Sequence, residues 1–378
     1  MEQTYSPDVK IYPAGEGALL SIADMLAYFE KMGAMRVSDL HIKIGTQPAY
    51  RIDGELVRLK GGVVTQPIAE QLIYPLLGEK NVEYLKRDFA VDCSYKFGTL
   101  QYRINAFKEN DGLACAIRAL GTDIPEPEKI GFPNSAWQDI VRKKHGLILF
   151  TGITGAGKST TIASLIDRIN QNRASRIITL EDPIEYIFTQ NNSMISQREL
   201  GRDIDTFSHG LRSMMREDPD IIFVGEMRDA ETVSLVLTAA ETGHLVFSTL
   251  HTRDVTGTIT RILDFFPHQK QDEVRNQLSL GLEYIICQKL IPNKEGNGRV
   301  AAMEILNSNY AIANLIRKGK IEQIYSQMQV KTKDQADERM ITLERHLAIL
   351  VKQGQIDVLE AEKWANDIKS FQDAMKNT

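Results

Sequence analysis

The sequence contains few of the features that mark secreted, metal-binding or membrane-spanning proteins. It has three cysteines in 378 residues, Cys93, Cys115 and Cys287, which are odd in number and far apart. Such a set gives neither a disulfide framework nor a Cys-x-x-Cys metal site. No run is apolar enough to span a bilayer, and residues 1–5 lack the basic region and apolar stretch of a secretion signal. We therefore expect a cytoplasmic protein without direct membrane insertion.

The chain also lacks a strong charge of either sign. Lys and Arg number 45 against 50 Asp and Glu, so the formal net charge is -5. This balance gives no bulk attraction to phosphate backbones or to anionic lipid, and no basic cluster with interleaved aromatic residues is present. We expect no nucleic-acid partner, which makes DNA translocation a weak hypothesis.

The length of the chain suits two domains. Residues 1–120 combine a helical apolar pattern with alternating strand patterns, and Asp53-Gly54 between two strand-like runs predicts a hairpin. These residues predict a smaller α+β domain. Residues 121–134 contain three prolines and two glycines with little apolar periodicity, which predicts an exposed linker.

Residues 135–378 show a different pattern. Apolar runs at 147–150, 176–180, 221–224 and 245–248 alternate with helical stretches, and the last seventy or so residues look helical. Alternation of this kind is typical of a parallel sheet covered by helices on both faces. The predicted fold class is therefore α/β for the second domain.

A glycine-rich segment follows the first of these apolar runs directly. It matches the phosphate-binding loop pattern of four residues between a glycine and Gly-Lys-Ser, and a helical stretch follows it. Glycines let backbone amides surround phosphate oxygens, while Lys158 can reach the β and γ phosphates and Ser159 can offer its hydroxyl to Mg²⁺. The sequence therefore predicts an ATP and Mg²⁺ site. The predicted nucleotide-binding residues here are Gly152, Thr154, Gly155, Ala156, Gly157, Lys158, Ser159 and Thr160.

Acidic residues follow two of the later apolar runs. Glu181, Asp182 and Glu185 come after one run, and Glu226 comes after the next. The carboxyl ends of parallel strands bind ligands, so these acids are candidates for holding Mg²⁺ and for orienting an attacking water. Gly225 stands where many phosphate-loop enzymes have the metal-binding aspartate, which moves that role to Glu226. The alternative is that the acids are solvated caps of the helices that follow.

Two histidines, His244 and His251, bracket the apolar run that begins at residue 245. Histidine near a γ-phosphate can report the nucleotide state through hydrogen bonds, although a lone histidine is more often a structural hydrogen-bonding group. The spacing matches no zinc motif. A nucleotide-sensing role and a structural role both stay open.

Together these stretches resemble the type IV pilus twitching-motility ATPases, the retraction branch of the type II/IV secretion ATPase superfamily. The similarity covers nearly the whole chain. The four stretches that correspond to the Walker A, Asp box, Walker B and His box motifs are Gly152 to Thr160, Glu181 to Glu185, Glu217 to Asp229 and Ala240 to Thr252.

The resemblance implies a hexameric ring of two-domain subunits, each with a PAS-like N-terminal domain and a RecA-like P-loop ATPase domain. By matching motif, Lys158 with Ser159 or Thr160 would bind MgATP, Glu226 would hold the metal, and Glu185 would activate water. The ring would be a motor for pilus retraction at the cytoplasmic face of the inner membrane. Its implied partners are further copies of itself and an inner-membrane pilus platform protein, and a paralogous pilus ATPase is a further candidate.

The resemblance also assigns roles to basic residues. His244 and His251 would form the His-box pair, and Arg103 and Arg118 occupy the strand positions from which family arginines reach the phosphates of a neighbouring subunit. The alternating pattern around Arg103 agrees, because it puts this side chain on the face opposite the apolar residues. Hydrolysis would then depend on assembly.

One departure from the family pattern keeps other functions open. Retraction ATPases have Ala-Ile-Arg before Leu-Ile-Arg, whereas this chain has Ala313 at the first arginine position. An accessory or regulatory pilus ATPase subunit is therefore an alternative. A pilus extension or type II secretion ATPase is another, although the scattered cysteines argue against the four-cysteine zinc insertion usual in those relatives.

Overall fold

The chain forms two compact units. The computed structural model describes residues 5–32, 36–52, 55–120, 124–296, 298–329 and 339–377. The first unit combines Met1–Asp123 with Asp182–Ile187, and the second combines Ile124–Glu181 with Phe188–Thr378.

The first unit is built around an antiparallel sheet of six strands in the order β5-β4-β3-β8-β7-β6. The predicted Asp53-Gly54 turn lies outside the described residues, but the two strands beside it, β4 and β5, pair as a hairpin would. The elements of this unit are β1 Tyr12–Pro13, β2 Leu19–Leu20, α1 Ile22–Met32, β3 Val37–Lys43, β4 Ala49–Ile52, β5 Glu55–Arg58, α2 Gln66–Asp88, β6 Ala90–Phe97, β7 Leu100–Glu109 and β8 Gly112–Leu120.

Helices α1 and α2 contact one face of this sheet. Their apolar residues pack with strand residues such as Leu40, Ile104 and Ile117, each fully buried. Side chains alternate along a strand, so the residues between these point to the opposite face. That opposite face carries charged side chains, among them Arg103 and Arg118.

The segment expected as a linker is only partly extended. Its first residues, 121–123, lie outside the described residues, and the second unit begins at Ile124. Pro127 starts the short helix α3, Pro127–Ile130, because its fixed φ suits the first position of a helix. Glu128 of this helix pairs with Arg168 at 2.7 Å. Residues 124–134 therefore pack with the second unit.

The second unit contains a sheet of seven strands in the order β11-β10-β12-β13-β9-β14-β15, in which only β15 runs antiparallel to its neighbour. The four predicted apolar runs form β9, β10, β12 and β13, and these strands pair in parallel. The elements are α4 Ala136–Ile140, β9 Gly146–Thr151, α5 Lys158–Asn172, β10 Arg176–Glu181, β11 Met194–Glu199, α6 Phe207–Met214, β12 Ile221–Val224, α7 Ala230–Glu241, β13 Leu245–Leu250, α8 Val255–Asp264, α9 His268–Gly281, β14 Leu282–Pro292, β15 Arg299–Asn307, α10 Tyr310–Arg317, α11 Ile324–Gln329, α12 Leu343–Lys352, α13 Val358–Trp364 and α14 Ile368–Asn377.

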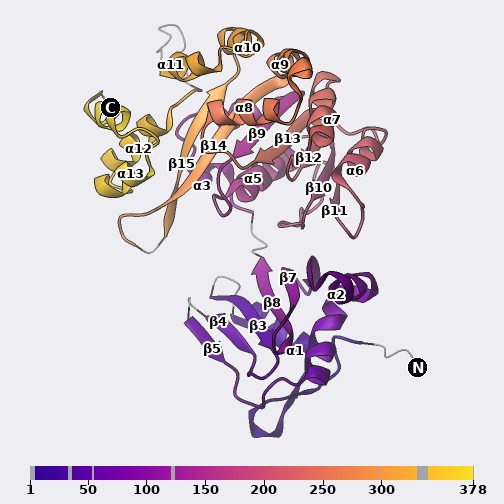
Figure 1. The fold of residues 1–378 in the computed structure, drawn as a ribbon. Coiled ribbons are helices and arrows are strands. Elements are labelled where there is room, and N and C mark those ends of the chain that lie inside the picture. Colours follow the sequence, from indigo (N-terminus) through magenta and orange to yellow (C-terminus); the bar gives the residue numbers. More distant parts are fainter. Residues whose placement is uncertain are drawn as a thin grey trace. The chain divides into compact units, whose positions relative to one another are not determined.

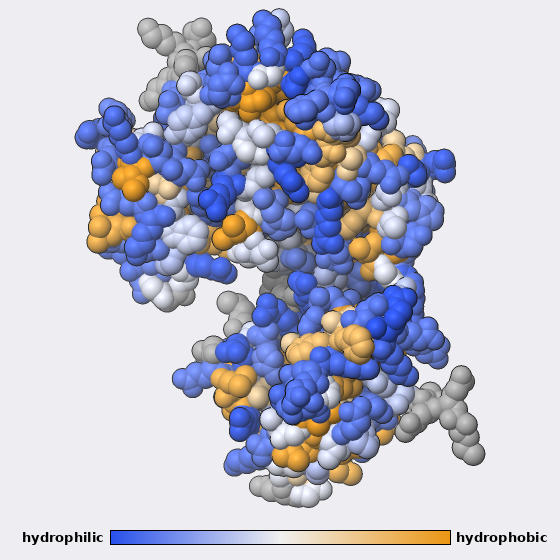
Figure 2. Space-filling view, viewed as in Figure 1, coloured by the Kyte–Doolittle hydropathy of each residue, from blue (hydrophilic) through white to orange (hydrophobic). Residues whose placement is uncertain are grey.

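Helices cover both faces of this sheet, which confirms the predicted α/β class (Figure 1). Leu147, Ile222 and Val246 face a core shared with α6 to α9, whereas α5 packs on β9 from the other side. Every residue of β9, β12 and β13 is buried. Figure 2 shows that hydrophilic side chains dominate the face in view and that apolar ones form separate patches. Among the described residues, none of the helices combines the length and apolar character needed to cross a membrane.

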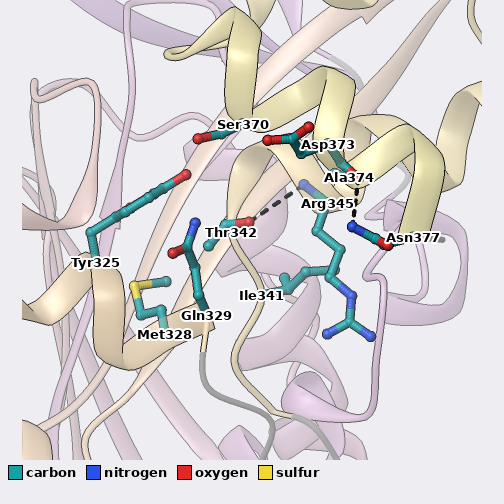
Figure 3. A pocket seen from close by; sticks show the side chains of 10 residues that line it. All are labelled: Tyr325, Met328, Gln329, Ile341, Thr342, Arg345, Ser370, Asp373, Ala374 and Asn377. Carbon is teal, nitrogen blue, oxygen red and sulfur yellow. Dashed lines mark hydrogen bonds between the residues drawn. The ribbon is translucent and has the colours of Figure 1, made fainter.

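The last three helices form a small core of their own against β14 and β15. A cavity of about 290 Å³ lies where α11, α12 and α14 meet (Figure 3). Tyr325 and Arg345 line it, and none of its lining residues was predicted to bind nucleotide. Tyr325 donates a hydrogen bond to Glu344 at 3.1 Å, so these side chains join the C-terminal helices to each other.

A buried carboxyl group connects β15 to α8. Glu304 on β15 is 3% exposed, and its Oε2 accepts a hydrogen bond from the backbone N–H of Val255, the first residue of α8. Burial raises the pKa of Glu304 to about 8, against an ordinary value of 4.5. The group is therefore mostly protonated in the folded protein at neutral pH.

We predict that Glu304→Gln changes the pH dependence of stability. Between its ordinary pKa of 4.5 and about 8, Glu304 holds more proton in the folded than in the unfolded state. Its stabilisation is complete below the lower value and is lost as the pH rises through the upper one, with a slope of up to about 1.4 kcal/mol per pH unit. Glutamine does not titrate. Urea unfolding from about pH 5 to about pH 8.5 should show the wild type losing stability relative to the variant, and a constant difference would contradict the assignment.

Candidate functional site

The glycine-rich segment forms a tight loop between β9 and α5. Gly152 and Gly157 have φ values of 140° and 85°, in the region that favours glycine. A Cβ on Gly152 would collide with the backbone oxygen of Gln288, and one on Gly157 would lie 2.8 Å from the Gln288 side-chain nitrogen. Within the loop, Thr154 and Gly155 are exposed. On the side that faces β14, the loop backbone therefore approaches Gln288 so closely that side chains at positions 152 and 157 would not fit.

Lys158 is the first residue of α5 and is only 8% exposed. Its Nζ donates to the carbonyl oxygens of Gly152 at 2.8 Å and Ile153 at 3.1 Å, so the ammonium group is folded back over the loop. Ser159 and Thr160 follow on the first turn and are half-buried. Because the positive end of the helix dipole points to the same place, the loop, Lys158 and α5 together favour an anion.

A residue far away in the sequence braces this loop. Gln288 on β14 donates from Nε2 to the Ala156 carbonyl at 2.8 Å and accepts from the Thr161 hydroxyl at 2.8 Å. It is 2% exposed. One amide side chain thus bonds to both the end of the loop and the first turn of α5. No local pattern indicates Gln288, because its partners are more than a hundred residues earlier.

Glu226 lies at the same edge of the sheet as the loop. It follows β12, and β13 separates β12 from β9 in the strand order. Glu226 Oε2 accepts from Arg228 Nε at 2.9 Å, and Glu226 Oε1 lies 3.4 Å from His251 Nε2. His251 directly follows β13. The structure therefore places His251 and Arg228 against Glu226, and the sequence analysis gave Arg228 no role.

His244 is not part of this group within one chain. It precedes β13, which runs parallel to β9 from Leu245 opposite Gly146 to Leu250 opposite Thr151. A strand advances about 3.3 Å per residue, so His244 lies about 20 Å from the edge that carries the loop. Its Nδ1 is 3.0 Å from the Ala239 carbonyl oxygen. This contact fits a structural role within one chain, and the nucleotide-sensing role of His244 stays a prediction.

Glu181 ends β10 but does not point freely into the site. Glu181 is 6% exposed, and its carboxylate accepts hydrogen bonds from the Thr179 hydroxyl at 2.6 Å and from Gln197 Nε2 at 3.2 Å. Gln197 belongs to β11, the edge strand on the side of β10 away from β9. These two hydrogen bonds hold the Glu181 carboxylate at the end of β10, and its predicted role in nucleotide binding stays a prediction.

Asp182 and Glu185 come next in the chain and belong to the segment Asp182–Ile187, which groups with the first unit. Asp182 is exposed and Glu185 is half-buried. The apolar pattern of β10 indicates where this segment begins, but not that it leaves the second unit. The catalytic role predicted for Glu185 remains a prediction.

Arg103 and Arg118 lie directly opposite each other on β7 and β8 of the first unit. Their side chains are 45% and 65% exposed. Arg118 Nε binds the Asp39 carboxylate at 2.7 Å, and Arg103 Nε lies 3.6 Å from Asp92. Burial of Asp39 alone would raise its pKa, but hydrogen bonds from Ser38 and Arg118 outweigh burial and lower it. Both arginines are therefore held on the face away from α1 and α2.

The residues at the loop edge suit a magnesium ion that keeps most of its water. Among the described residues, no cluster of three or more His, Cys, Asp or Glu side chains could hold a metal. Mg²⁺ typically takes one or two carboxylates plus substrate phosphates and water, so such a cluster is not required. Ser159 and Glu226 are the residues here with suitable oxygen atoms.

Comparisons with known proteins agree with these features. Residues 115–358 match the type II/IV secretion system protein family. The chain is 40% identical to the type IV pilus retraction ATPase PilT of Pseudomonas aeruginosa over 93% of this chain and 100% of that protein. It is 40% identical to a twitching motility protein of Neisseria gonorrhoeae over 86% of each. The crystal structure of the pilus retraction motor PilT with bound ADP matches with a TM-score of 0.84 at 43% identity, over 94% of this chain and 99% of that one.

We predict that Gly157→Ala weakens nucleotide binding more than Gly155→Ala. Both glycines have positive φ, so both variants carry backbone strain, but only a Cβ on Gly157 meets Gln288; none lies within 4 Å of Gly155. Displacing Gln288 removes its bonds to Ala156 and Thr161. Calorimetric titration with ADP should show an affinity about tenfold lower for Gly157→Ala than for Gly155→Ala. Equal affinities would contradict the bracing role of Gln288.

Proposed function

The chain belongs to the type II/IV secretion system protein family, and we propose that it is an ATPase motor that drives type IV pilus retraction. The observation that carries this proposal is the phosphate loop with Lys158 buried against it and Glu226 on the same sheet edge, in a chain 40% identical to PilT along that protein's full length. The proteins it resembles include a pilus retraction ATPase and a twitching motility protein.

The side chains of the second unit divide the work of phosphoryl transfer, in which the protein mainly positions groups and stabilises charge. The loop amides and Lys158 hold the β and γ phosphates. Ser159 and Glu226 hold Mg²⁺, which when bound neutralises charge on the phosphate oxygens. Arg228 and His251 keep the Glu226 carboxylate in place through contacts at 2.9 Å and 3.4 Å.

Glu185 is the acid that we propose activates the attacking water. A general base needs a carboxylate within reach of the water, and Glu185 follows the end of β10, where the parallel strands present their carboxyl ends. Its segment packs with the first unit.

Arg103 and Arg118 are proposed to reach the phosphates bound by a neighbouring subunit of a hexameric ring. Both guanidinium groups are substantially exposed on the open sheet face. An arginine supplied from a neighbour can raise turnover by orders of magnitude. Hydrolysis would then require assembly. The ring is proposed to act from the cytoplasmic face of the inner membrane on a pilus platform protein.

We predict that substitutions of Glu185 and Glu226 affect ATPase activity in different ways. Glu185→Gln should lower kcat about a hundredfold or more while ATP binding stays close to wild type, because only the base is lost. Glu226→Gln should raise the Mg²⁺ concentration required for activity, because a metal ligand is weakened. Steady-state ATPase assays over a Mg²⁺ series measure both.

The matched control for these variants is Glu231→Gln. Glu231 is an exposed glutamate of α7 whose carboxylate pairs with Arg212. The Glu231→Gln variant should hydrolyse ATP like the wild type. Wild-type rates at all Mg²⁺ concentrations for Glu185→Gln or Glu226→Gln would reject the role given to that residue.

A second candidate function is an accessory subunit that binds ATP and modulates a partner ring. The observation that favours it is Ala313 on α10, in place of the arginine of retraction ATPases. α10 buries Ile312 and Ile316 and leaves Tyr310 87% exposed, so Ala313 changes the surface of an outer helix and not the phosphate site. Hydrolysis is unaffected in either function.

Deleting the gene separates the two candidates. Loss of a retraction motor should leave excess pili on the cell and abolish twitching, because extension continues without its reverse step. Electron microscopy of pili and a twitching assay measure this, with the wild-type gene restored as control. Unchanged pilus number with normal twitching would favour the accessory role.

A further inference from the structure

The open face of the first unit carries a row of residues that runs across five strands. In antiparallel pairs, residues directly opposite each other lie on the same face with Cβ atoms about 5 Å apart. Arg51 on β4 is opposite Asp39 on β3, and Asp39 is opposite Arg118 on β8. Arg118 is opposite Arg103 on β7, and Arg103 is opposite Ser94 on β6. Arg51 therefore shares one row with the two arginines already considered.

Asp39 joins two of these arginines. Its side chain is 7% exposed, Arg118 Nε is 2.7 Å from its Oδ1, and Arg51 Nε is 4.0 Å from its Oδ2. The Ser38 hydroxyl adds a hydrogen bond to Oδ2 at 2.7 Å. The arginine side chains are more exposed than that of Asp39, at 65% for Arg118 and 42% for Arg51. One buried carboxylate thus lies between two exposed arginine side chains.

Stability alone is a poor reason for this arrangement. Like charges directly opposite in a strand pair are destabilising, and Arg118 faces Arg103 in that way. Ion pairs with partners this exposed contribute about 0–1 kcal/mol. The next row on the same face adds His41, opposite Ala116, whose Nε2 is buried without a hydrogen-bond partner among the described residues. Such local conflicts are expected where a face is completed by a ligand.

We propose that Arg51 is a third phosphate-facing arginine and that Asp39 is the positioning residue that orients Arg51 and Arg118 as a pair. This inference rests on the proposed function, in which this face meets the nucleotide of a neighbouring subunit. Asp39 acts through the arginines and does not touch the nucleotide. Two guanidinium groups beside one carboxylate suit the several oxygens of a triphosphate, because each carries a planar fork of N–H donors.

The test measures kcat and KM for ATP in Arg51→Ala, Arg51→Lys and Asp39→Asn, in the full-length protein. Arg51→Ala and Asp39→Asn should each lower kcat about tenfold or more with KM nearly unchanged, because the interaction is made in the transition state. Arg51→Lys should not restore kcat, because an ammonium group lacks the planar fork of donors. Wild-type kcat in Arg51→Ala overturns the role of Arg51, and wild-type kcat in Asp39→Asn overturns the positioning role.

A matched pair on the same unit controls for loss of surface charge. Arg87 and Asp88 on α2 form an exposed ion pair at 2.6 Å. Arg87→Ala and Asp88→Asn should leave kcat unchanged. Thermal unfolding checks the fold of every variant, and an Arg51→Ala protein that fails to fold overturns the inference in favour of a purely structural role.

Mixed rings show on which side of a subunit boundary Arg51 acts. Lys158→Ala removes the loop lysine, so rings of this variant alone, or of Arg51→Ala alone, should be nearly inactive. When the Lys158→Ala and Arg51→Ala variants assemble together in equal amounts, about a quarter of the head-to-tail boundaries join an intact loop to an intact Arg51. Partial recovery of ATPase activity supports the inference, and no recovery overturns it.

A second mixture, in which Arg118→Ala replaces Arg51→Ala beside Lys158→Ala, distinguishes failure of the inference from failure of the proposed function. Recovery with Arg118→Ala, together with wild-type activity of Arg51→Ala, rejects the inference and leaves the proposed function standing. Wild-type activity of Arg118→Ala alone rejects the arginine role within the proposed function, and the inference falls with it.

Discussion

The close approach of β14 to the phosphate loop is the constraint on which the second unit depends. Gln288 bonds to Ala156 and Thr161, and the positions of Gly152 and Gly157 leave no space for a Cβ beside it. The loop is therefore held in a tight shape in which three glycines have positive φ. Preorganisation of this kind lets the backbone amides bind phosphate without a further ordering cost.

The parallel sheet brings charged side chains from other strands to the edge that carries this loop. Because β9, β13 and β12 are adjacent and run in the same direction, the loop, His251 and Glu226 reach one edge. The chain as a whole has a net charge of -5, but at this edge Lys158, Arg228 and Glu226 set the local field. Each of these charges has partners within its own unit.

The first unit has a second charged surface, which the register of its antiparallel strands produces. Its antiparallel sheet buries one face under α1 and α2, and the register of five strands aligns Arg51, Asp39, Arg118 and Arg103 on the other. A row across strands can hold like charges close together only because the strands are fixed by the core beneath them. In the proposed ring, this surface and the loop edge of the next subunit complete one another, which would make ATP turnover a property of the assembly.

The sequence by itself determined the parts whose signals are local. The spacing of glycines and Lys158 predicted the loop, and the apolar runs predicted β9, β10, β12 and β13, because backbone conformation and strand burial depend mainly on neighbouring residues. Only the tertiary structure decided that Gln288 braces the loop, that Glu181 is bonded into the sheet, and that Asp39 joins Arg51 to Arg118. These relations depend on strand order and register between segments far apart in the chain, and no local pattern of residue types encodes which strands become neighbours.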